Sequence, residues 1–397
     1  MYQLEDGHDS GLQRWAFVAT VAAAFFMPFS LPGGRVFLYL ALIMCITWWI
    51  RDRHSPQVAP LVRLAIAWIT LAVVVTLCSP YFEAGESKLR KLLPWLTLIA
   101  VSNLVISRER VRVVFTAFIL GCGVLAIRVF TEHTVEAMDL VRVGEFDTLG
   151  AALVHVGSMT DSQRLMVGII FALGFMLSGK RESRAAPWLW AALMLFLVAA
   201  LIINFKRGSW ICTASGCGVL LLWRGRMRTW GVALLLVICV VAVPTVRARL
   251  TDLGKELERP GGRITMWFTV APELIREYPQ GIGYRVLTND MMREIAPEVE
   301  PRRDHLHSNI AQVLVATGWV GLLLYMAWMG TALFDSFRWC IQRFSRPAGG
   351  LPLMLIAALV SLLLNGLVEY NFGDGEVVLI YVLLMGIAAA GVRRVEA

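Results

Sequence analysis

The chain has 397 residues, of which 57% are hydrophobic and 17% are charged, and its formal net charge is +8. Ordinary globular domains contain about 45–50% apolar and about 25% charged residues, so this composition excludes a typical soluble domain. Long apolar runs separated by short charged clusters are instead typical of a protein that crosses a membrane several times.

The apolar runs predict an all-α integral membrane protein with about twelve transmembrane helices. Roughly 20 apolar residues cross the hydrocarbon core, and the shorter runs here would borrow flanking residues. We expect helices 1–9 in residues 1–246, one large loop in 247–306 and helices 10–12 in 307–397. The expected helices cover about 12–31, 35–50, 61–78, 89–106, 111–130, 164–178, 186–203, 209–223, 229–246, 307–336, 350–369 and 376–392.

Basic residues recur in alternate connections between these helices. By the positive-inside rule, these connections lie in the cytoplasm, and so do both termini. The excess of positive charge therefore has a topological reason, and a nucleic-acid partner is not expected. The basic connections contain Arg51 and Arg53; Arg108, Arg110 and Arg112; Lys180, Arg181 and Arg184; Arg224, Arg226 and Arg228; Arg338, Arg343 and Arg346; and Arg393 and Arg394.

Cofactor motifs are missing from the sequence. The seven cysteines lie in apolar runs or at their ends, without C-x-x-C or Cys/His ligand spacing, so neither a disulfide framework nor a zinc site is expected. The chain also has no G-x-x-x-x-G-K-[ST] loop, which disfavours a nucleotide-driven pump. We therefore expect no metal, no nucleotide and no other cofactor.

The outer connections hold the less usual sequence, above all the large loop at 247–306. Loops of this length generally have a function or a structure of their own. Apolar residues recur within it at helical spacing, which predicts an amphipathic helix on the membrane or on the bundle. Pro272 is expected to start a second helical piece or to kink the first. The pattern consists of Ile264, Trp267, Phe268, Ala271 and Ile275.

A polar cluster joins this loop to the tenth helix and contains Asp304, His305, His307, Ser308 and Asn309. Ionisable side chains at a membrane boundary are costly unless they are paired or used, so the cluster is a candidate functional site. His307 is the main candidate, because a neutral imidazole beside Asp304 could accept a proton from a sugar hydroxyl. The alternative is a histidine at a helix start that nearby backbone satisfies.

Four cations on the same outer side predict a site for a phosphate or diphosphate linked to a lipid. Guanidinium groups bind phosphate through paired, charge-assisted hydrogen bonds, and the lipid tail would lie between helices. The four residues are Arg164, Lys206, Arg207 and Arg263.

Each of these cations also has a simpler interpretation. Lys206 and Arg207 could extend to the membrane interface as a pair. Arg263 could form an ion pair within its loop, with Glu256 or Glu258. Asp161, three residues earlier in the chain, could neutralise Arg164.

Three short motifs resemble a known family. The residues from His307 to Gly321 read H-S-x9-G-x2-G, which resembles the H-[NSQ]-x9-G-x2-G motif of bacterial O-antigen ligases, within the O-antigen ligase and polymerase superfamily. Arg207-Gly208-Ser209-Trp210 is similar to the family's arginine at the start of a mid-chain helix. Gly262-Arg263 with Trp267 resembles its G-R-x3-W element in the large periplasmic loop.

The resemblance implies a multi-pass, GT-C-like glycosyltransferase of the bacterial inner membrane, with a periplasmic active site. Such an enzyme transfers a glycan from undecaprenyl diphosphate to lipid A–core oligosaccharide during lipopolysaccharide biosynthesis, with inversion and without nucleotide or metal. His307 would activate the acceptor hydroxyl, and Arg207 and Arg263 would hold the diphosphate. Charge placement alone adds Arg164 and Lys206, while the expected supporting residues around the histidine are Asp304, His305 and Asn309.

The motifs leave other activities open. O-antigen polymerases and protein O-glycosyltransferases of the same superfamily share the histidine motif, although a single large loop before it favours the ligase. A transporter of lipid-linked glycan is the alternative that is not an enzyme. It predicts ionisable residues near the middle of the membrane, for which Arg128 is the main candidate.

Overall fold

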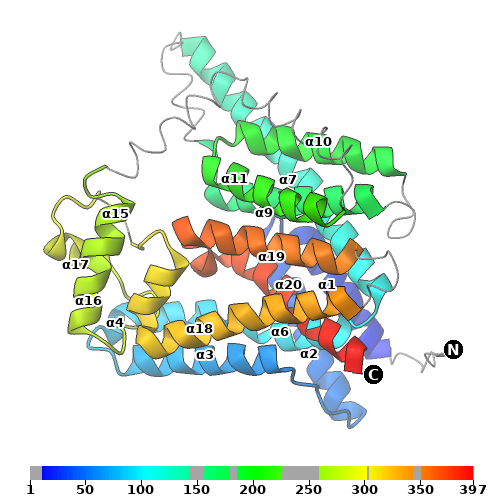
Figure 1. The fold of residues 1–397 in the computed structure, drawn as a ribbon, viewed down its shortest axis with the longest axis horizontal. Coiled ribbons are helices and arrows are strands. Elements are labelled where there is room, and N and C mark those ends of the chain that lie inside the picture. The colour runs from blue at the N-terminus through cyan, green and yellow to red at the C-terminus, as the bar shows by residue number, and fades with distance from the viewer. Residues whose placement is uncertain are drawn as a thin grey trace.

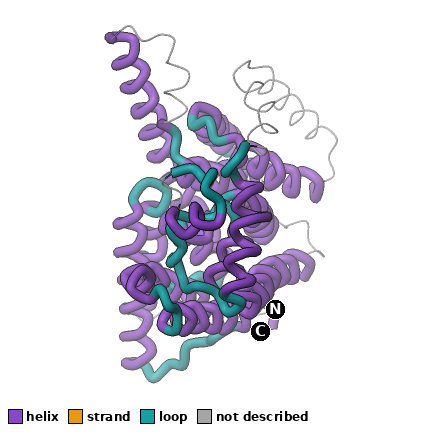
Figure 2. Tube along the Cα trace, turned by 90° about the vertical axis from the view of Figure 1, so that its left-hand side faces the viewer, coloured by secondary structure: helices purple, strands orange, loops and turns teal. Residues whose placement is uncertain are grey.

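The computed structural model describes residues 11–143, 156–178, 186–224, 259–301, 304–342 and 350–396. Every regular element in these residues is a helix, which confirms the all-α prediction (Figure 2). Six of the described helices are long and apolar enough to cross a membrane, and three shorter apolar helices accompany them. The chain is therefore a multi-pass membrane protein by length and composition, whereas twelve spans and a GT-C-like fold stay predictions. The expected helix at 229–246 lies outside the described residues.

Proline and serine start several helices in the first part of the chain. The side chain of Ser30 accepts a hydrogen bond from the Gly33 amide and caps α2, where Pro32 occupies the first turn. Proline also begins α3 and α10. The helices are α1 (Gly11–Phe26), α2 (Leu31–Arg51), α3 (Pro60–Leu77), α4 (Phe82–Gly85), η1 (Glu86–Leu92), α5 (Leu93–Leu96), α6 (Leu98–Leu104), α7 (Arg108–Val143), α9 (Met159–Ser178), α10 (Pro187–Ile203) and α11 (Arg207–Arg224).

Two of these elements differ from the sequence prediction. The single helix expected at 89–106 is wrong, because a 3-10 turn, α5 and α6 follow one another there. Pro94 cannot donate a backbone hydrogen bond. The Thr97 hydroxyl donates a hydrogen bond to the Pro94 carbonyl at 2.6 Å. The helix expected at 111–130 instead continues to Val143, so part of the predicted loop is helical. This end of α7 projects beyond its neighbours (Figure 1).

The large loop contains the expected helix, divided at Pro272 into a π-helical turn and α16. Its pattern has two faces. Ala271 and Ile275 are buried, whereas Ile264 and Phe268 are 42% and 74% exposed, so only part of the apolar pattern packs on the protein. The elements of this half are α15 (Arg263–Thr265), η3 (Met266–Val270), α16 (Ala271–Glu277), α17 (Asn289–Ile295), α18 (Asn309–Gln342), α19 (Gly350–Val368), η4 (Asn371–Gly373) and α20 (Gly375–Glu396).

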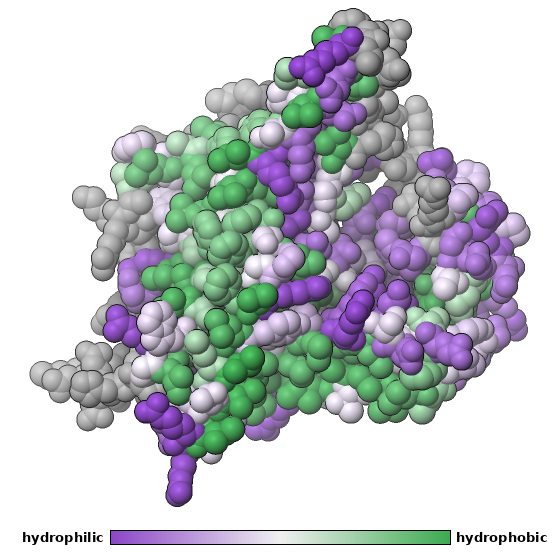
Figure 3. Space-filling model, turned by 180° about the vertical axis from the view of Figure 1, so that it is seen from behind, coloured by the Kyte–Doolittle hydropathy of each residue, from purple (hydrophilic) through white to green (hydrophobic). Residues whose placement is uncertain are grey.

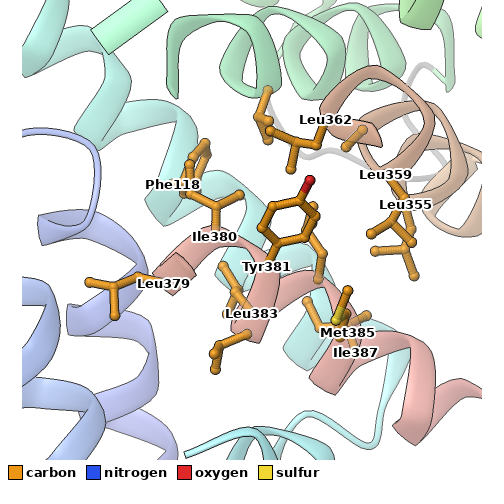
Figure 4. Packing of buried hydrophobic residues seen from close by; sticks show 14 of the residues in the cluster. Phe118, Leu355, Leu359, Leu362, Leu379, Ile380, Tyr381, Leu383, Met385 and Ile387 are labelled. Atoms are coloured by element: carbon orange, nitrogen blue, oxygen red, sulfur yellow. The ribbon is translucent and has the colours of Figure 1, made fainter. Parts of the chain in front are cut away.

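Helix α20 forms the centre of the bundle. From Val377 to Ala390 its residues are buried all round, as a helix that is apolar on every face requires. It contacts α18, α6 and α9. Figure 4 shows Tyr381 and its apolar neighbours on α20 between Phe118 of α7 and the leucines of α19. The loop that enters α20 is consequently held in the interior of the protein.

The two ends of the bundle differ in character. The start of α1 and the end of α20 lie at one end, and α15, α16 and α17 lie at the other (Figure 1). Hydrophilic side chains gather over α15–α17, on the right in Figure 3, while apolar side chains cover the adjoining sides of the bundle. The large-loop segment therefore forms a polar layer at one end of an apolar helical bundle.

Candidate active site

His307 lies in a tight turn that starts α18. Its backbone φ of 49° falls in the left-handed region, which residues other than glycine rarely adopt and which is often found at functional sites. The Ser308 hydroxyl accepts a hydrogen bond from the Ala311 amide at 3.4 Å and caps the helix. The Leu306 amide donates to the Gln312 side chain at 2.9 Å. These bonds hold the turn that carries His307.

The G-R-x3-W element of the large loop reaches this turn with both of its side chains. Arg263 and Trp267 are four residues apart and thus share one helical face. The Trp267 indole N–H donates to the Leu306 carbonyl at 2.6 Å. Arg263 forms an ion pair with Glu369. The spacing of the element therefore has a structural reason, since one side chain holds the turn and the other meets a carboxylate.

Glu369, directly after α19, is the carboxylate that contacts His307. Its Oε2 lies 3.1 Å from Nδ1 of His307, and its Oε1 is bonded to Nη2 of Arg263. The residue is only 7% exposed, so these two partners must replace the water that an ionised carboxylate would otherwise bind. When Nδ1 donates its proton to Glu369, Nε2 of His307 carries the lone pair that can accept a proton.

The pKa directions describe a neutral base beside an ionised carboxylate. Burial lowers the pKa of His307, although Glu369 opposes this effect by hydrogen bonding and charge. Burial alone would raise the pKa of Glu369, but the hydrogen bond to His307 and the charge of Arg263 outweigh it, and the pKa lies below its usual range. His307 is therefore uncharged near neutral pH, as a general base must be.

The predicted neighbours Asp304 and His305 form a pair of their own. Oδ1 of Asp304 lies 2.7 Å from Nδ1 of His305. This hydrogen bond is the main reason that the pKa of Asp304 is lowered to about 2. The His305 ring lies 4.3 Å from the His307 ring, centroid to centroid. Asp304 thus orients the neighbouring histidine, and the carboxylate at His307 is Glu369, which the sequence analysis missed.

Asn309 ties the start of α18 to the loop that carries Glu369. Its Nδ2 donates to Asn371 Oδ1 at 2.7 Å, and its Oδ1 accepts from the Phe372 amide at 3.0 Å. The Tyr381 hydroxyl of α20 donates to the same Asn371 oxygen at 3.1 Å. Asn309, predicted as a supporting residue, therefore joins α18 to this loop, and Asn371 joins the loop to α20.

Phe372 anchors the same loop in an aromatic cluster. The residue is 1% exposed, and its ring centroid lies 4.8 Å from that of Trp95 and 5.0 Å from that of Tyr325. Trp68 and Trp328 complete the contact at 5.2 and 5.5 Å. Packing of this kind allows little movement. Glu369, three residues before Phe372, is therefore carried by a rigid loop.

The first glycine of the histidine motif, Gly318, interrupts α18 where the large loop is attached. Gly318 has φ 65°, outside the helical range, and a Cβ there would come within 2.4 Å of a carbonyl oxygen. The amides of Ile282 and Gly283 donate to the carbonyls of Val315 and Ala316 at 2.9 and 3.0 Å. The nine-residue spacing therefore joins the base at the helix start to the point where the large loop is attached.

Lys206 and Arg207 start α11 beside the end of α19. Both side chains are half-buried. A Cβ at Gly208 would lie 3.8 Å from Nδ2 of Asn365, which is one helical turn before Glu369. The start of α11 therefore lies about one helical turn of α19 away from Glu369.

Arg164 lies in a different cluster. It is 4% exposed and forms an ion pair with Asp161, which also accepts a hydrogen bond from Nη2 of Arg128 at 2.7 Å. The structure therefore agrees with the simpler interpretation of Arg164, in which Asp161 neutralises its charge. Arg128, the candidate for a mid-membrane charge, belongs to the same cluster.

One group of described residues offers atoms that could hold a metal ion. The ligand atoms of His305, His307 and Glu369 lie within 4.8 Å of one another. Both oxygens of Glu369 are already bonded, to Arg263 and to His307, and the arginine would repel a cation. A metal would have to displace these contacts, so the group fits a resident ion poorly.

Together these features define a multi-pass membrane protein with a buried histidine at one end of its bundle, bonded to a carboxylate that also holds an arginine. Residues 191–326 match the family model described as O-antigen ligase. This part of the chain, which contains Arg207, Arg263 and His307, is therefore similar to the O-antigen ligase family of glycosyltransferase-like ligases and polymerases. A search among curated proteins finds no match. Glu369 lies beyond the matched residues.

Proposed function

We propose that this protein is an O-antigen ligase that moves a glycan from undecaprenyl diphosphate to lipid A–core oligosaccharide. One observation carries the proposal. A single carboxylate, Glu369, holds both the candidate base His307 and the candidate diphosphate ligand Arg263, two residues of the matched segment. Glycan transfer from a lipid diphosphate needs a base for the acceptor and a cation for the leaving group in one place.

In this reaction His307 is the general base. Nε2 takes the proton of the acceptor hydroxyl while the hydroxyl oxygen attacks the anomeric carbon of the donor sugar. The bond between that carbon and the phosphate oxygen breaks, and its electron pair leaves with the diphosphate. Glu369 stabilises the imidazolium through Nδ1–H, and the proton then passes to solvent. Direct displacement inverts the anomeric centre.

The leaving diphosphate is the proposed ligand of Arg263, Arg207 and Lys206. Guanidinium groups bind phosphate oxygens in pairs and offset the charge that develops as the bond breaks, which removes the need for a metal. Arg164, because it is buried and paired with Asp161, is proposed to hold α9 in place and not to contact the diphosphate. The exposed Ile264 and Phe268 offer an apolar surface for the prenyl chain, one turn of helix from Arg263.

The proposed orientation places the active site in the periplasm and both termini in the cytoplasm. The basic connections predict it, and the start of α1 and the end of α20 lie at the end of the bundle opposite α15–α17, which agrees with it (Figure 1). The partners in this arrangement are the bilayer of the inner membrane, the lipid-linked glycan donor and the lipid A–core acceptor.

Ligation with purified components tests the function. The protein in nanodiscs would receive a defined undecaprenyl-diphosphate glycan and lipid A–core, and the products would be separated by mass. Glycan attached to lipid A–core, with inverted configuration, is the expected result. Glycan added to a second donor would identify a polymerase, and glycan added to protein would identify an O-glycosyltransferase. Donor movement across the bilayer without a new glycosidic bond would identify a transporter.

A further inference from the structure

Glu369 is a buried carboxylate whose two oxygens serve two different elements. Oε1 is bonded to Arg263 of the large loop, 106 residues earlier, and Oε2 to His307, 62 residues earlier. The Glu369 side chain is 10% exposed, and that of Arg263 is 26% exposed. Any change at the arginine therefore reaches the histidine through one carboxylate.

Arg263 retains the capacity to bind a second anion. A guanidinium has five N–H donors, Nη2 of Arg263 serves Glu369, and 26% of the Arg263 side chain is exposed. A diphosphate that bound the Arg263 guanidinium would share this cation with Glu369. Two anions on one guanidinium repel each other, so the incoming ligand weakens the hold of Arg263 on Glu369.

We propose that Glu369 is a positioning residue that couples donor binding to the proton affinity of His307. The inference rests on the proposed function. Before the donor binds, Arg263 and His307 share the carboxylate. When the diphosphate takes Arg263, the carboxylate turns to His307 alone and favours its protonated form more strongly. The imidazole thus becomes the better base only when a donor is present.

The surroundings of the two groups are consistent with such an exchange. His307 faces Glu369, His305 and Arg263, and the two basic neighbours lower its pKa while Glu369 raises it. A diphosphate that neutralised Arg263 would remove its lowering effect, so the pKa of His307 would rise. Asp374, a half-buried acid on the same loop, interacts electrostatically with His305, Glu376, Arg285 and Glu369, so it provides a matched control.

The first test separates donor affinity from turnover. Binding of undecaprenyl diphosphate to the protein in nanodiscs would be measured without acceptor, for wild type, E369Q and D374N. We expect E369Q to bind this lipid about fivefold more tightly or better, a typical allosteric coupling, because the competing charge is gone. Its kcat should nevertheless fall, whereas D374N should bind as wild type does. A residue with only a structural role would weaken binding and turnover together.

The second test uses the pH dependence of turnover. kcat/KM reports the pKa of the free protein and kcat that of the donor-bound protein. The coupling predicts that the apparent pKa from kcat is higher by about one pH unit, and that the two values coincide in E369Q. E369D, which keeps the charge, should restore part of the difference.

Several outcomes would overturn the inference, and they differ from failure of the function. Equal or weaker lipid binding by E369Q, or coincident profiles in the wild-type protein, would refute the coupling while leaving the ligase intact. No binding of undecaprenyl diphosphate by the wild type would instead refute the proposed function, and the coupling with it.

Discussion

Two buried carboxylates in this protein each hold two basic side chains, and only one of the pairs can do acid–base chemistry. Asp161 uses a single oxygen for Arg128 and Arg164. Glu369 uses one oxygen for an arginine and the other for His307. The first cluster therefore contains only permanent cations, while the second contains a group that titrates near neutrality.

The two clusters also differ in how the chain assembles them. Arg164 is three residues from Asp161 on the same helix, so local geometry forms that ion pair. Glu369 meets partners from two distant segments, and their meeting depends on the whole bundle. Asp161 therefore pairs cations of neighbouring helices, whereas Glu369 contacts the proposed catalytic group.

The largest expected effect is on turnover at the second cluster. Replacement His307→Ala should lower the ligation rate by about 10²–10⁴-fold, the usual contribution of a general base. Purified ligation with matched protein amounts would measure it. His133→Gln is the control, because His133 is an equally buried histidine whose Nδ1 lies 2.8 Å from the Val129 carbonyl, in another part of the bundle. Undiminished turnover by the His307 variant would show that His307 is not the general base.

The first cluster should respond in stability. Asp161→Ala leaves Arg164 buried without its partner, which should cost roughly 3–5 kcal/mol of folding free energy. Thermal unfolding in detergent would show the loss. Adding Arg164→Met to Asp161→Leu should recover most of it, since apolar replacement of a whole buried ion pair is often neutral. An unfolding midpoint unchanged by Asp161→Ala would contradict a structural role.

Acid should lower turnover through the second cluster. The neutral imidazole of His307 is the active form, and burial places its pKa below the usual value of about 6.5. kcat/KM should therefore be constant above that pKa and fall about tenfold per pH unit below it. A conservative variant of the other cluster, Asp161→Asn, should show the same profile. A rate that does not respond to acid would refute His307 as the base.

Chelation should have the smallest effect. His305, His307 and Glu369 could in principle share an ion, but the proposed reaction uses arginines in its place. Ligation in excess EDTA should proceed within about twofold of the untreated rate, an effect near the limit of kinetic comparison. A large loss that zinc or magnesium restores would show that these three residues hold a working metal.

Much of the site could be predicted from local sequence patterns. His307 was identified by its place before an apolar helix and by the spacing to Gly318, both of which depend on neighbouring residues. The amphipathic pattern found the helix that carries Arg263 and Trp267. Glu369 carried no such signal, because a single glutamate after an apolar run is also typical of an ordinary helix end.

By itself, the sequence determined the helical class and most of the apolar helices and singled out His307 as the candidate base, because hydrophobic runs and helix starts are encoded within one or two turns of chain. Only the tertiary structure decided that α7 continues to Val143, that the chain at 89–106 is broken, and which carboxylate each base receives. Those outcomes depend on contacts between segments far apart in the chain. Asp304 is three residues from His307 and pairs with another histidine, while Glu369, 62 residues away, is brought to it by the packing of Phe372 and by Asn309.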